Sequence, residues 1–365
     1  MTTAAGGLRV RLRRAVPFAL DVGFEAPAGA ITALFGPSGG GKTTVLRAIA
    51  GLQAMDEAAV SCGDGTWADT AAGLWVAPHR RPVGLVFQDY ALFPHLTVRE
   101  QLALSMGHRP ASGRPARIDA LLELVRLQDL GDRRPAALSG GQQQRAALAR
   151  ALARDPAVLL LDEPFAAVDW ALRESLRREL VRLQRALSLT VLLVTHDFED
   201  VAKLAAHLVV LERGAVTASG SVEALTGRNV VPGVSGWREP AVALDARVDA
   251  HYPDRQLSVI AAGTLRLEVP AIAAPVGAPV RLQLAAREVI LASRRPEGLS
   301  LHNVVEAEVV AVEPASHEAL RLVHLSVGST RLLSLVTADA AHKLALAPGR
   351  PVLALVKAVA IEAFA

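Results

Sequence analysis

The sequence has 365 residues, 51% of them hydrophobic, and a formal net charge of only +3 at pH 7. Mean hydropathy is +0.31, yet no uncharged apolar run reaches the roughly 18 residues that a membrane-spanning helix needs. Charge is spread along the chain and aromatic residues make up 4%, so a nucleic-acid-binding surface is not expected. The single cysteine, Cys62, excludes an internal disulfide, and the first residues lack a signal-peptide core; both features favour the cytoplasm.

Short apolar runs alternate with helical stretches from residue 1 to about 228, which predicts an α/β domain. Strands are expected at residues 30–35, 83–88, 158–162, 189–195 and 208–211, and helices at 44–52, 118–127, 141–154 and 170–187. Several of these strands are apolar at consecutive positions, as in a parallel sheet that is covered by helices on both faces.

The second part of the chain has a different texture. Proline and glycine recur near residues 232–240, which predicts a linker at 229–240. Residues 241–365 then contain short alternating runs, such as 265–269 and 280–284, which predict an all-β domain.

This β region contains an internal repeat. The matched positions are Gly277 with Gly349, Pro279 with Pro351, Val280 with Val352, and Gly263 with Gly328. Two similar units in tandem, each burying one sheet face, would form a pair of small barrels. Chance similarity among Ala- and Val-rich strands is the alternative.

The segment GPSGGGKT has the pattern G-x-x-x-x-G-K-[ST] between a predicted strand and a predicted helix. In a phosphate-binding loop, backbone N–H groups point at phosphate oxygens, and larger side chains would obstruct them. The helix N-terminus and the lysine add positive charge, and the threonine hydroxyl can ligate Mg²⁺. We therefore expect ATP to be bound by Gly36, Pro37, Ser38, Gly39, Gly40, Gly41, Lys42, Thr43 and Thr44, with Thr43 also binding Mg²⁺.

The apolar strand 158–162 ends at Asp162 and is followed directly by Glu163. A buried strand tip can hold the first carboxylate toward Mg²⁺ and the second toward an attacking water. An acidic pair at a strand end also fits an ordinary turn, but the phosphate loop upstream favours the functional interpretation.

Two further segments could reach a phosphate. LSGGQQQR is a second glycine loop that opens a helix, with Ser139 at the expected N-cap, and predicts a second possible anion site. His196, in VTHD, follows the last apolar strand of the series. A histidine at a strand end is more often structural, but this one lies where a γ-phosphate could be reached.

Over residues 1 to about 228 the sequence resembles the nucleotide-binding subunits of ABC transporters. The resemblance is carried, in order, by GPSGGGKT, VFQDYALFPHLTV, LSGGQQQR, LLLDEP, AAVD and VTHD. It implies an α/β P-loop NTPase fold, an ABC ATPase cassette with a helical subdomain at about 90–155. It also implies that Glu163 is the general base, that His196 contacts the γ-phosphate, and that Gln88 senses the γ-phosphate and joins Thr43 and Asp162 at Mg²⁺.

The same resemblance implies partners. In a head-to-tail homodimer, Ser139, Gly140, Gly141 and Gln142 of one subunit would close over the ATP of the other, and Asp169 would link the subunits. Residues 90–97 would contact an integral membrane permease dimer, which works with an extracytoplasmic oxyanion-binding protein. Without the resemblance, the apolar side chains of residues 90–97 would be interpreted as part of the core. The chain would then lie on the cytoplasmic face of the inner membrane. The family often stacks adenine on an aromatic residue upstream of the phosphate loop. In the corresponding region here, RVRLRRAVPFALDV, Phe18 is the only ring available.

The C-terminal part resembles molybdate importer ATPases and the OB-like Mop/TOBE barrel that they carry, here at about 299–363. The resemblance implies ATP hydrolysis that powers the uptake of molybdate or tungstate, with oxyanion contacts at Ser300, His302, Asn303 and Lys357. Two features depart from the family: His302 stands where arginine is usual, and apolar residues follow Lys357 where hydroxyls are common. A desolvated dianion needs several donors, so a barrel that regulates or dimerises without binding molybdate is an open alternative.

Three other functions are weighed against this one. The same motor could carry sulfate, iron, polyamines or sugars. A soluble ABC ATPase acting on DNA or ribosomes would show a long coiled-coil insertion or a second cassette, and neither occurs between Gly41 and Asp197. A molybdate store built from Mop barrels would leave the cassette unexplained.

Overall fold

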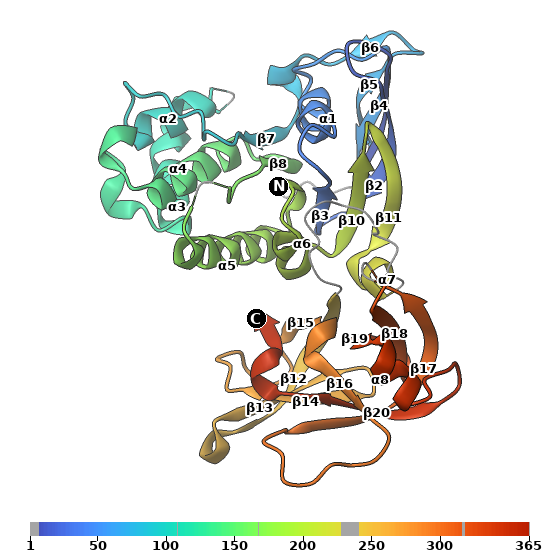
Figure 1. Ribbon diagram of the computed structural model, residues 1–365. Helices are drawn as coiled ribbons and strands as arrows, with labels where there is room; N and C mark the ends of the chain where they lie inside the picture. The colour runs from blue at the N-terminus through green and yellow to red at the C-terminus, as the bar shows by residue number, and fades with distance from the viewer. Residues whose placement is uncertain (1–6, 108, 167, 228–240, 316–317, 365) are drawn as a thin grey trace. The chain divides into compact units, whose positions relative to one another are not determined.

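The computed structural model describes residues 7–107, 109–166, 168–227, 241–315 and 318–364 (Figure 1). They form two compact units, one ending at Gly220 and one beginning at Ser221. The expected linker at 229–240 lies outside the described residues. Helix α7 (Val222–Gly227) packs against β12 (Ala241–Tyr252) and belongs to the second unit, although the sequence-based boundary was placed at 228. No helix in the described part of the chain combines the length and apolar character needed to cross a membrane.

A single mixed sheet of eleven strands organises the described part of the first unit, in the order β6-β5-β4-β1-β2-β11-β10-β3-β9-β8-β7. The strands are β1 (Leu8–Arg14), β2 (Leu20–Ala26), β3 (Ile31–Phe35), β4 (Glu57–Cys62), β5 (Gly65–Asp69), β6 (Leu74–Trp75), β7 (Val83–Val86), β8 (Val158–Asp162), β9 (Thr190–Thr195), β10 (His207–Glu212) and β11 (Ala215–Ser221). The helices are α1 (Lys42–Ile49), α2 (Val98–Ser105), α3 (Arg114–Leu124), α4 (Gly140–Leu152), α5 (Trp170–Leu187) and α6 (Phe198–Leu204).

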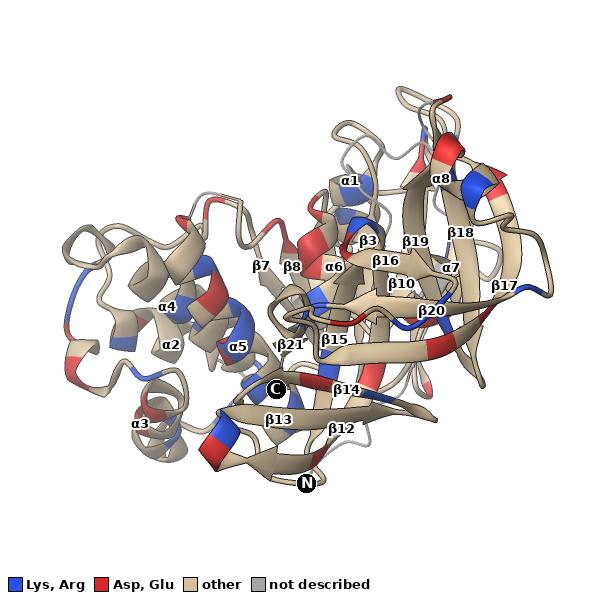
Figure 2. Ribbon diagram, turned by 60° about the horizontal axis from the view of Figure 1, so that its bottom comes forward, with Lys and Arg blue, Asp and Glu red and all other residues tan. Residues whose placement is uncertain are grey.

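The five strands predicted from apolar runs form the parallel half of this sheet. Strands β3, β8 and β9 are buried at every residue, as expected for strands covered on both faces. Among the five predicted strands, β7 ends at Val86, two residues before its predicted end. Helices α2, α3 and α4 pack on one another and fill the stretch expected as a helical subdomain. Figure 2 shows basic and acidic segments along α5, the helix whose bounds match the prediction in full.

The buried side chain of Arg81 caps the C-terminal end of α1. Its side chain is 0% exposed. The guanidinium Nη1 donates to the carbonyl oxygens of Ala48 and Ile49 at 3.0 and 2.7 Å, and its carbon lies 4.7 Å from the centre of the Trp75 ring. Burial lowers the pKa of Arg81 to about 10, so the group stays cationic at neutral pH. A cation at this position is stabilised by the negative end of the helix dipole.

Replacing Arg81 by methionine is expected to lower the free energy of unfolding of the first unit by about 3 kcal/mol. The change keeps most of the apolar stem but removes the arginine donor from the carbonyl of Ile49, while the carbonyl of Ala48 keeps its bond from the N–H of Gly51 at 3.0 Å. Calorimetry should show a fall in Tm of roughly 2–4 °C per kcal/mol. The matched control is Arg80→Met, because Arg80 is exposed and its loss should leave Tm almost unchanged. Equal Tm values for the two variants would contradict the role given to Arg81.

The second unit confirms the internal repeat. Its described residues contain two antiparallel sheets of five strands, ordered β14-β13-β12-β15-β21 and β16-β20-β17-β18-β19. Their strands are β12, β13 (Leu257–Ala262), β14 (Leu265–Pro270), β15 (Pro279–Ala285), β16 (Val289–Ala292), β17 (Asn303–Pro314), β18 (Leu320–Val327), β19 (Thr330–Thr337), β20 (Pro351–Val356) and β21 (Glu362–Phe364), and α8 (Ala338–Lys343) follows β19. The matched glycines have equal backbone angles: φ is 59° at Gly263 and Gly328, and 83° at Gly277 and Gly349.

The two repeats exchange their last strands. Strand β16 follows β15 along the chain but pairs with β20, and β21 follows β20 but pairs with β15. The hairpin turns are joined in the same reciprocal way: Thr264 donates to the carbonyl of Val327 at 3.3 Å, and Thr330 to that of Ala262 at 3.0 Å. Buried residues of both sheets form one continuous core. The repeats are therefore one folding unit and not two separate barrels.

Candidate nucleotide-binding site

The carboxyl ends of four parallel strands meet at one edge of the large sheet. Phe35 pairs with Thr195, Asp162 with Val194, and Val86 with Leu161. The segments that follow these strands therefore leave the sheet side by side. Gly36 follows β3, His196 follows β9, Glu163 follows β8, and Gln88 lies two residues after the end of β7. Ligands of open α/β sheets bind at this edge, so the structure brings the predicted cassette residues together where a ligand would be expected.

Lys42 lies at the centre of the glycine loop, as the first residue of α1. Its Nζ donates to the carbonyl oxygens of Gly36 and Pro37 at 2.8 and 2.9 Å, and the residue is 5% exposed. Burial lowers the pKa of Lys42, and the nearby Glu163 and Asp162 oppose this effect. The loop thus holds a cation directly at a helix N-terminus, which is the arrangement that binds phosphate.

The loop glycines meet two different requirements. A Cβ on Gly36 would lie 2.0 Å from the carbonyl oxygen of Leu211 in β10, so the backbone can approach this strand only without a side chain. Gly39 and Gly41 have φ angles of 78° and 99°, in the region that favours glycine. An added Cβ on Gly39 would meet no atom within 4 Å, which leaves that side of the loop open to a ligand.

Thr43 and Asp162 form a pair of oxygen ligands beside the lysine. The Thr43 hydroxyl donates to Oδ1 of Asp162 at 3.1 Å, and Asp162 is 6% exposed. Burial raises the pKa of Asp162, and the hydrogen bond from Thr43 opposes this effect. Hydroxyl and carboxylate oxygens suit Mg²⁺, which takes its other ligands from phosphates and water in nucleotide sites.

Glu163 and His196 are in direct contact. Nδ1 of His196 lies 3.1 Å from Oε2 of Glu163. The backbone of Glu163 has a φ of 44°, and its N–H donates to the carbonyl of Val194 at 3.0 Å. A left-handed conformation is uncommon for a glutamate and turns the chain sharply after β8. Gln88, the third predicted catalytic residue, is exposed in the turn after β7.

The second glycine segment forms the start of α4, with Ser139 as the predicted N-cap. The Ser139 hydroxyl accepts from the N–H of Gln142, whose side chain accepts from the N–H of Ser139 at 2.8 Å. Gly141 packs against α5, because a Cβ there would lie 2.6 Å from Cδ1 of Leu172. An added Cβ on Gly140 would meet no atom within 4 Å. Of the two glycines in this turn, Gly140 is the one whose backbone borders open space.

Asp169 caps α5, since its carboxylate accepts from the N–H of Leu172 at 3.0 Å. It is the last residue of the AAVD segment, in which Ala167 lies outside the described residues. The predicted contacts of Asp169 and of the Ser139–Gln142 turn concern a second subunit, so they stay predictions.

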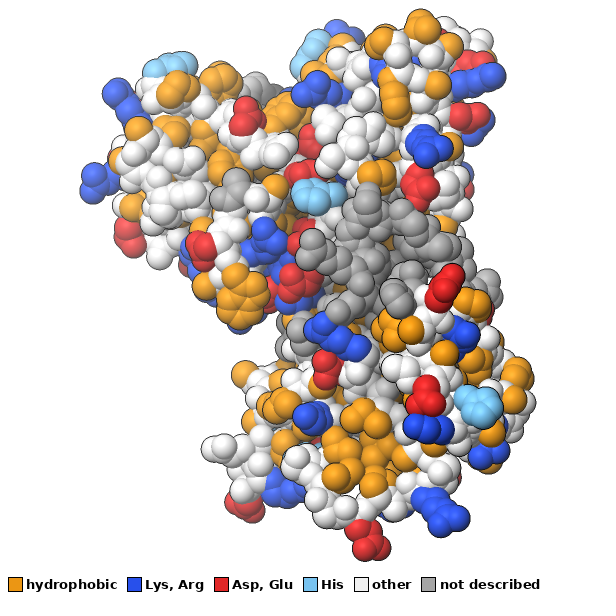
Figure 3. Space-filling view, in the orientation of Figure 1, with side chains coloured by type: hydrophobic (Ala, Val, Ile, Leu, Met, Phe, Trp, Pro, Cys, Tyr) orange, Lys and Arg blue, Asp and Glu red, His pale blue; other side chains and the backbone are white. Residues whose placement is uncertain are grey.

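The side chains at residues 90–97 do not form core. Tyr90, Leu92, Phe93 and Leu96 are all partly or fully exposed, with Phe93 at 41%. Figure 3 shows hydrophobic side chains at the surface of the lobe that holds α2, α3 and α4. The interpretation of this stretch as a docking surface is thus favoured over the core interpretation.

Phe18 packs against the phosphate loop. A Cβ on Gly41 or on Gly214 would lie 3.1 Å from Cε1 of its ring. One edge of the Phe18 ring therefore lies against these two glycines.

The four oxyanion candidates gather at one end of the β17–β20 pair. Asn303, the first residue of β17, pairs with Val356, the last residue of β20. His302 therefore precedes β17 at the same end where Lys357 follows β20, and both are exposed, as is Ser300. Asn303 is buried, and its amide binds the backbone of Glu268 in β14: Oδ1 accepts from the N–H at 2.6 Å and Nδ2 donates to the carbonyl at 2.9 Å. In this structure Asn303 joins the two sheets, and its oxyanion role stays a prediction.

Replacing Asn303 by alanine is expected to lower the free energy of unfolding of the second unit by about 1–3 kcal/mol, because both backbone groups of Glu268 lose their partner. Chemical denaturation followed by near-ultraviolet circular dichroism would measure this change. Ser300→Ala is the control, since Ser300 is exposed and its loss should change stability by less than about 0.5 kcal/mol. An unchanged denaturation midpoint for the Asn303 variant would contradict the stabilising role given to the Asn303–Glu268 hydrogen bonds.

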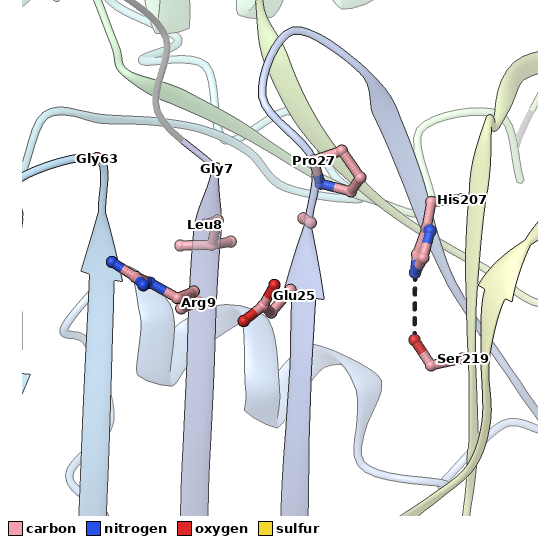
Figure 4. A pocket seen from close by; sticks show the side chains of 9 residues that line it. Gly7, Leu8, Arg9, Glu25, Pro27, Gly63, His207 and Ser219 are labelled. Atoms are coloured by element: carbon pink, nitrogen blue, oxygen red, sulfur yellow. Dashed lines mark hydrogen bonds between the residues drawn. The ribbon is translucent and has the colours of Figure 1, made fainter.

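A pocket of about 600 Å³ lies elsewhere in the first unit (Figure 4). Arg9, Glu25, His207 and Ser219 line it, and Nε2 of His207 lies 3.2 Å from the Ser219 hydroxyl. His207 is the first residue of β10, whereas the phosphate loop follows the last residue of the parallel neighbour β3. None of the residues predicted for nucleotide binding lines this pocket.

Comparison with known proteins agrees with this geometry. The ABC transporter family profile matches residues 20–166, and the TOBE domain profile matches residues 299–363. A protein named molybdenum import ATP-binding protein ModC from Thiobacillus denitrificans is 42% identical over 355 residues, which covers 97% of both chains. ModC 1 of Azotobacter vinelandii is 40% identical over 362 residues, or 98% of this chain and 99% of its own.

The chain belongs to the ABC transporter ATP-binding protein family. Its fold is accordingly an ABC ATPase cassette of the P-loop type followed by an all-β domain of the TOBE type, as the sequence predicted. The matched TOBE segment begins at residue 299 and so covers the second repeat, while the first repeat, from β12 to β15, precedes it.

Proposed function

We propose that this chain is the ATP-hydrolysing subunit of an ABC importer that drives molybdate, or tungstate, through a separate membrane permease. The observation that carries the proposal is the convergence of Lys42, the Thr43–Asp162 pair and the Glu163–His196 pair at one sheet edge. The cargo is supported by the names of relatives that match this chain across both units.

Each residue at the edge has a distinct task. Lys42 and the loop N–H groups bind the phosphates, and Thr43 and Asp162, with Gln88, would hold Mg²⁺. Bound Mg²⁺ would neutralise charge on the phosphate oxygens. Glu163 accepts the proton of the attacking water. His196 holds the Glu163 carboxylate through one ring nitrogen, which leaves its other nitrogen for the γ-phosphate.

The site is completed by a second copy of the chain. Within one chain the turn from Ser139 to Gln142 caps its own helix, and Gly140 presents bare backbone to open space. A helix N-terminus with an uncovered glycine suits close approach to a phosphate. We infer that this turn closes over ATP held by the partner, with Asp169 at the same subunit boundary.

The remaining partners follow from the exposed surface at residues 90–97. The exposed Phe93 and the partly exposed Tyr90, Leu92 and Leu96 suit a helix of the permease, and a dimer of cassettes would engage a dimer of permease subunits. The chain would then reside at the cytoplasmic face of the inner membrane. An extracytoplasmic oxyanion-binding protein would be an indirect partner, and nucleic acid is not a partner.

The second unit is proposed to regulate transport. The ATP-binding domain would end at about residue 220, α7 would belong with the β region at 241–365, and the Mop-like part of that region would span about 299–363. Oxyanion binding there would use the exposed end of the β17–β20 pair, with Ser300, His302 and Lys357. Calorimetry of molybdate against the full chain, compared with Lys357→Ala, would test this; equal heats of binding would remove Lys357 from the site.

The function is tested by uptake. Cells lacking this chain should lose molybdate uptake, and the wild-type chain should restore it while a Lys42→Ala chain does not. Uptake of sulfate, iron, polyamines and sugars should be unaffected and serves as the control for cargo. Loss of one of these solutes with normal molybdate uptake would overturn the cargo, and a purified chain with permease that hydrolyses no ATP would overturn the motor.

A further inference from the structure

Two arginines on one face of α5 hold the loop around His196. Arg173 pairs with Asp197, and Arg177 reaches Thr195 through Asp200 and lies 3.8 Å from Asp197. Arg173 and Arg177 are four residues apart, so their side chains lie on the same face of the helix. Nη1 of Arg173 lies 2.9 Å from Oδ2 of Asp197, the residue after His196. Nε of Arg177 donates to Oδ1 of Asp200 at 2.8 Å, and Oδ2 of Asp200 accepts from the hydroxyl of Thr195, the residue before His196, at 2.8 Å.

The two arginines differ in burial. Arg177 and Asp200 have side chains only 2% and 5% exposed, and Arg177 also pairs with Glu174 and Glu199. Removing one partner of such a buried network leaves an uncompensated charge, so Arg177 is needed for folding. Arg173 and Asp197 are 24% and 32% exposed, and Arg173 lines a small cavity with Glu163 and His196. Arg173 can therefore be changed without burying an unpaired charge.

The first turn of α5 also contacts the turn that carries Gly140. Leu172, the residue before Arg173, packs against Gly141 at the start of α4. Asp169 caps the same turn of α5. A shift of the Ser139–Gln142 turn would consequently move the first turn of α5, and with it the guanidinium that holds Asp197.

We propose that Arg173 is a positioning residue for ATP hydrolysis, which holds the loop from Thr195 to Asp197 so that His196 stays in contact with Glu163. It would thereby couple closure of the Ser139–Gln142 turn to the orientation of the general base. The inference rests on the proposed function, because it assigns Arg173 a task in the same reaction. Arg173 touches neither reacting group and acts through Asp197.

Kinetics of the purified chain with its permease would test the proposal. Arg173→Met and Asp197→Asn should each lower kcat about tenfold, while the KM for ATP changes less than about twofold. Asn keeps the cap on α6 that Asp197 provides to the N–H of Glu199. The double variant should be no slower than Asp197→Asn alone, because that change already removes the Arg173–Asp197 ion pair, together with the longer 3.8 Å pair between Asp197 and Arg177. Arg173→Lys should recover part of kcat, and Arg178→Met, at an exposed position of α5, should match the wild type.

A purely structural role predicts a different pattern. It would lower Tm by several degrees in step with kcat. Losses of the two single variants that multiply in the double variant would show instead that Arg173 and Asp197 act independently. Either result, or an Arg173→Met variant with wild-type kcat, would overturn the inference while an active wild-type chain keeps the proposed function. An inactive wild-type chain would instead overturn the proposed function itself.

Discussion

Replacing Glu163 by glutamine is expected to lower kcat for ATP hydrolysis by about 10²–10⁴-fold, with ATP binding retained. Glutamine has the size of glutamate and can still bind Nδ1 of His196, but it cannot accept the proton of the attacking water. The backbone at residue 163, with its φ of 44°, should be unaffected because both residues have the same Cβ. Turnover assays, combined with fluorescence titration of ATP, would separate the lost chemistry from binding.

Two observations sharpen the Glu163→Gln experiment. The variant should accumulate as an ATP-bound dimer, detectable by light scattering, because the proposed pair would open only after hydrolysis. Glu25→Gln is the matched control: Glu25 is exposed in β2, away from the sheet edge that binds nucleotide, and its variant should hydrolyse ATP at the wild-type rate. A Glu163→Gln chain with near-wild-type kcat would show that another group accepts the proton.

The candidate site was predictable because its residues form short contiguous motifs. Gly36 to Thr43 and His196 each follow an apolar strand, the Asp162–Glu163 pair lies at the end of another, and parallel strands end at the same edge of a sheet. Local sequence therefore fixed their common position without any knowledge of distant contacts. The N-cap role of Ser139 was predictable for the same reason, since the capping box lies within four residues.

The ion pairs around His196 were not predicted from the sequence, because they join residues that lie far apart along the chain. Arg173 and Arg177 were visible only as part of a helix with alternating Arg and Glu, a pattern that usually marks a solvated face. Their partners Asp197 and Asp200 lie more than twenty residues along the chain, across a buried strand. No local signal distinguishes the buried Arg177 from the exposed Arg178 one position later.

The strand exchange in the second unit was missed for a similar reason. The matched glycines predicted a repeat, but β16 and β21 are short, and their pairing with the other repeat depends on contacts made far along the chain. The antiparallel strands β1 and β2 were also missing from the predicted elements. Their regular alternation of buried and exposed residues was a signal that could have found them.

Replacing Gly140 by alanine is expected to lower kcat about 100-fold without destabilising the chain. An added methyl group at this position meets no atom within 4 Å of its own chain, and alanine is a better helix former than glycine, so Tm should stay equal or rise. Any loss of turnover must then arise from contact with something outside the chain. A methyl group between the α4 N-terminus and a partner's phosphates would have this effect. Wild-type kcat in the dimeric variant would contradict that contact.

Mixing two inactive variants distinguishes a composite site from a site within one chain. In a dimer of a Gly140→Ala chain with a Lys42→Ala chain, one site combines the intact Lys42 of the first with the intact Gly140 of the second. An equimolar mixture should therefore recover up to about one quarter of the wild-type rate, because half of the dimers are mixed and each has one intact site of two. If Gly140 served the ATP of its own chain, every site in the mixture would carry a defect. Activity that appears only on mixing can therefore come only from a site built by both subunits.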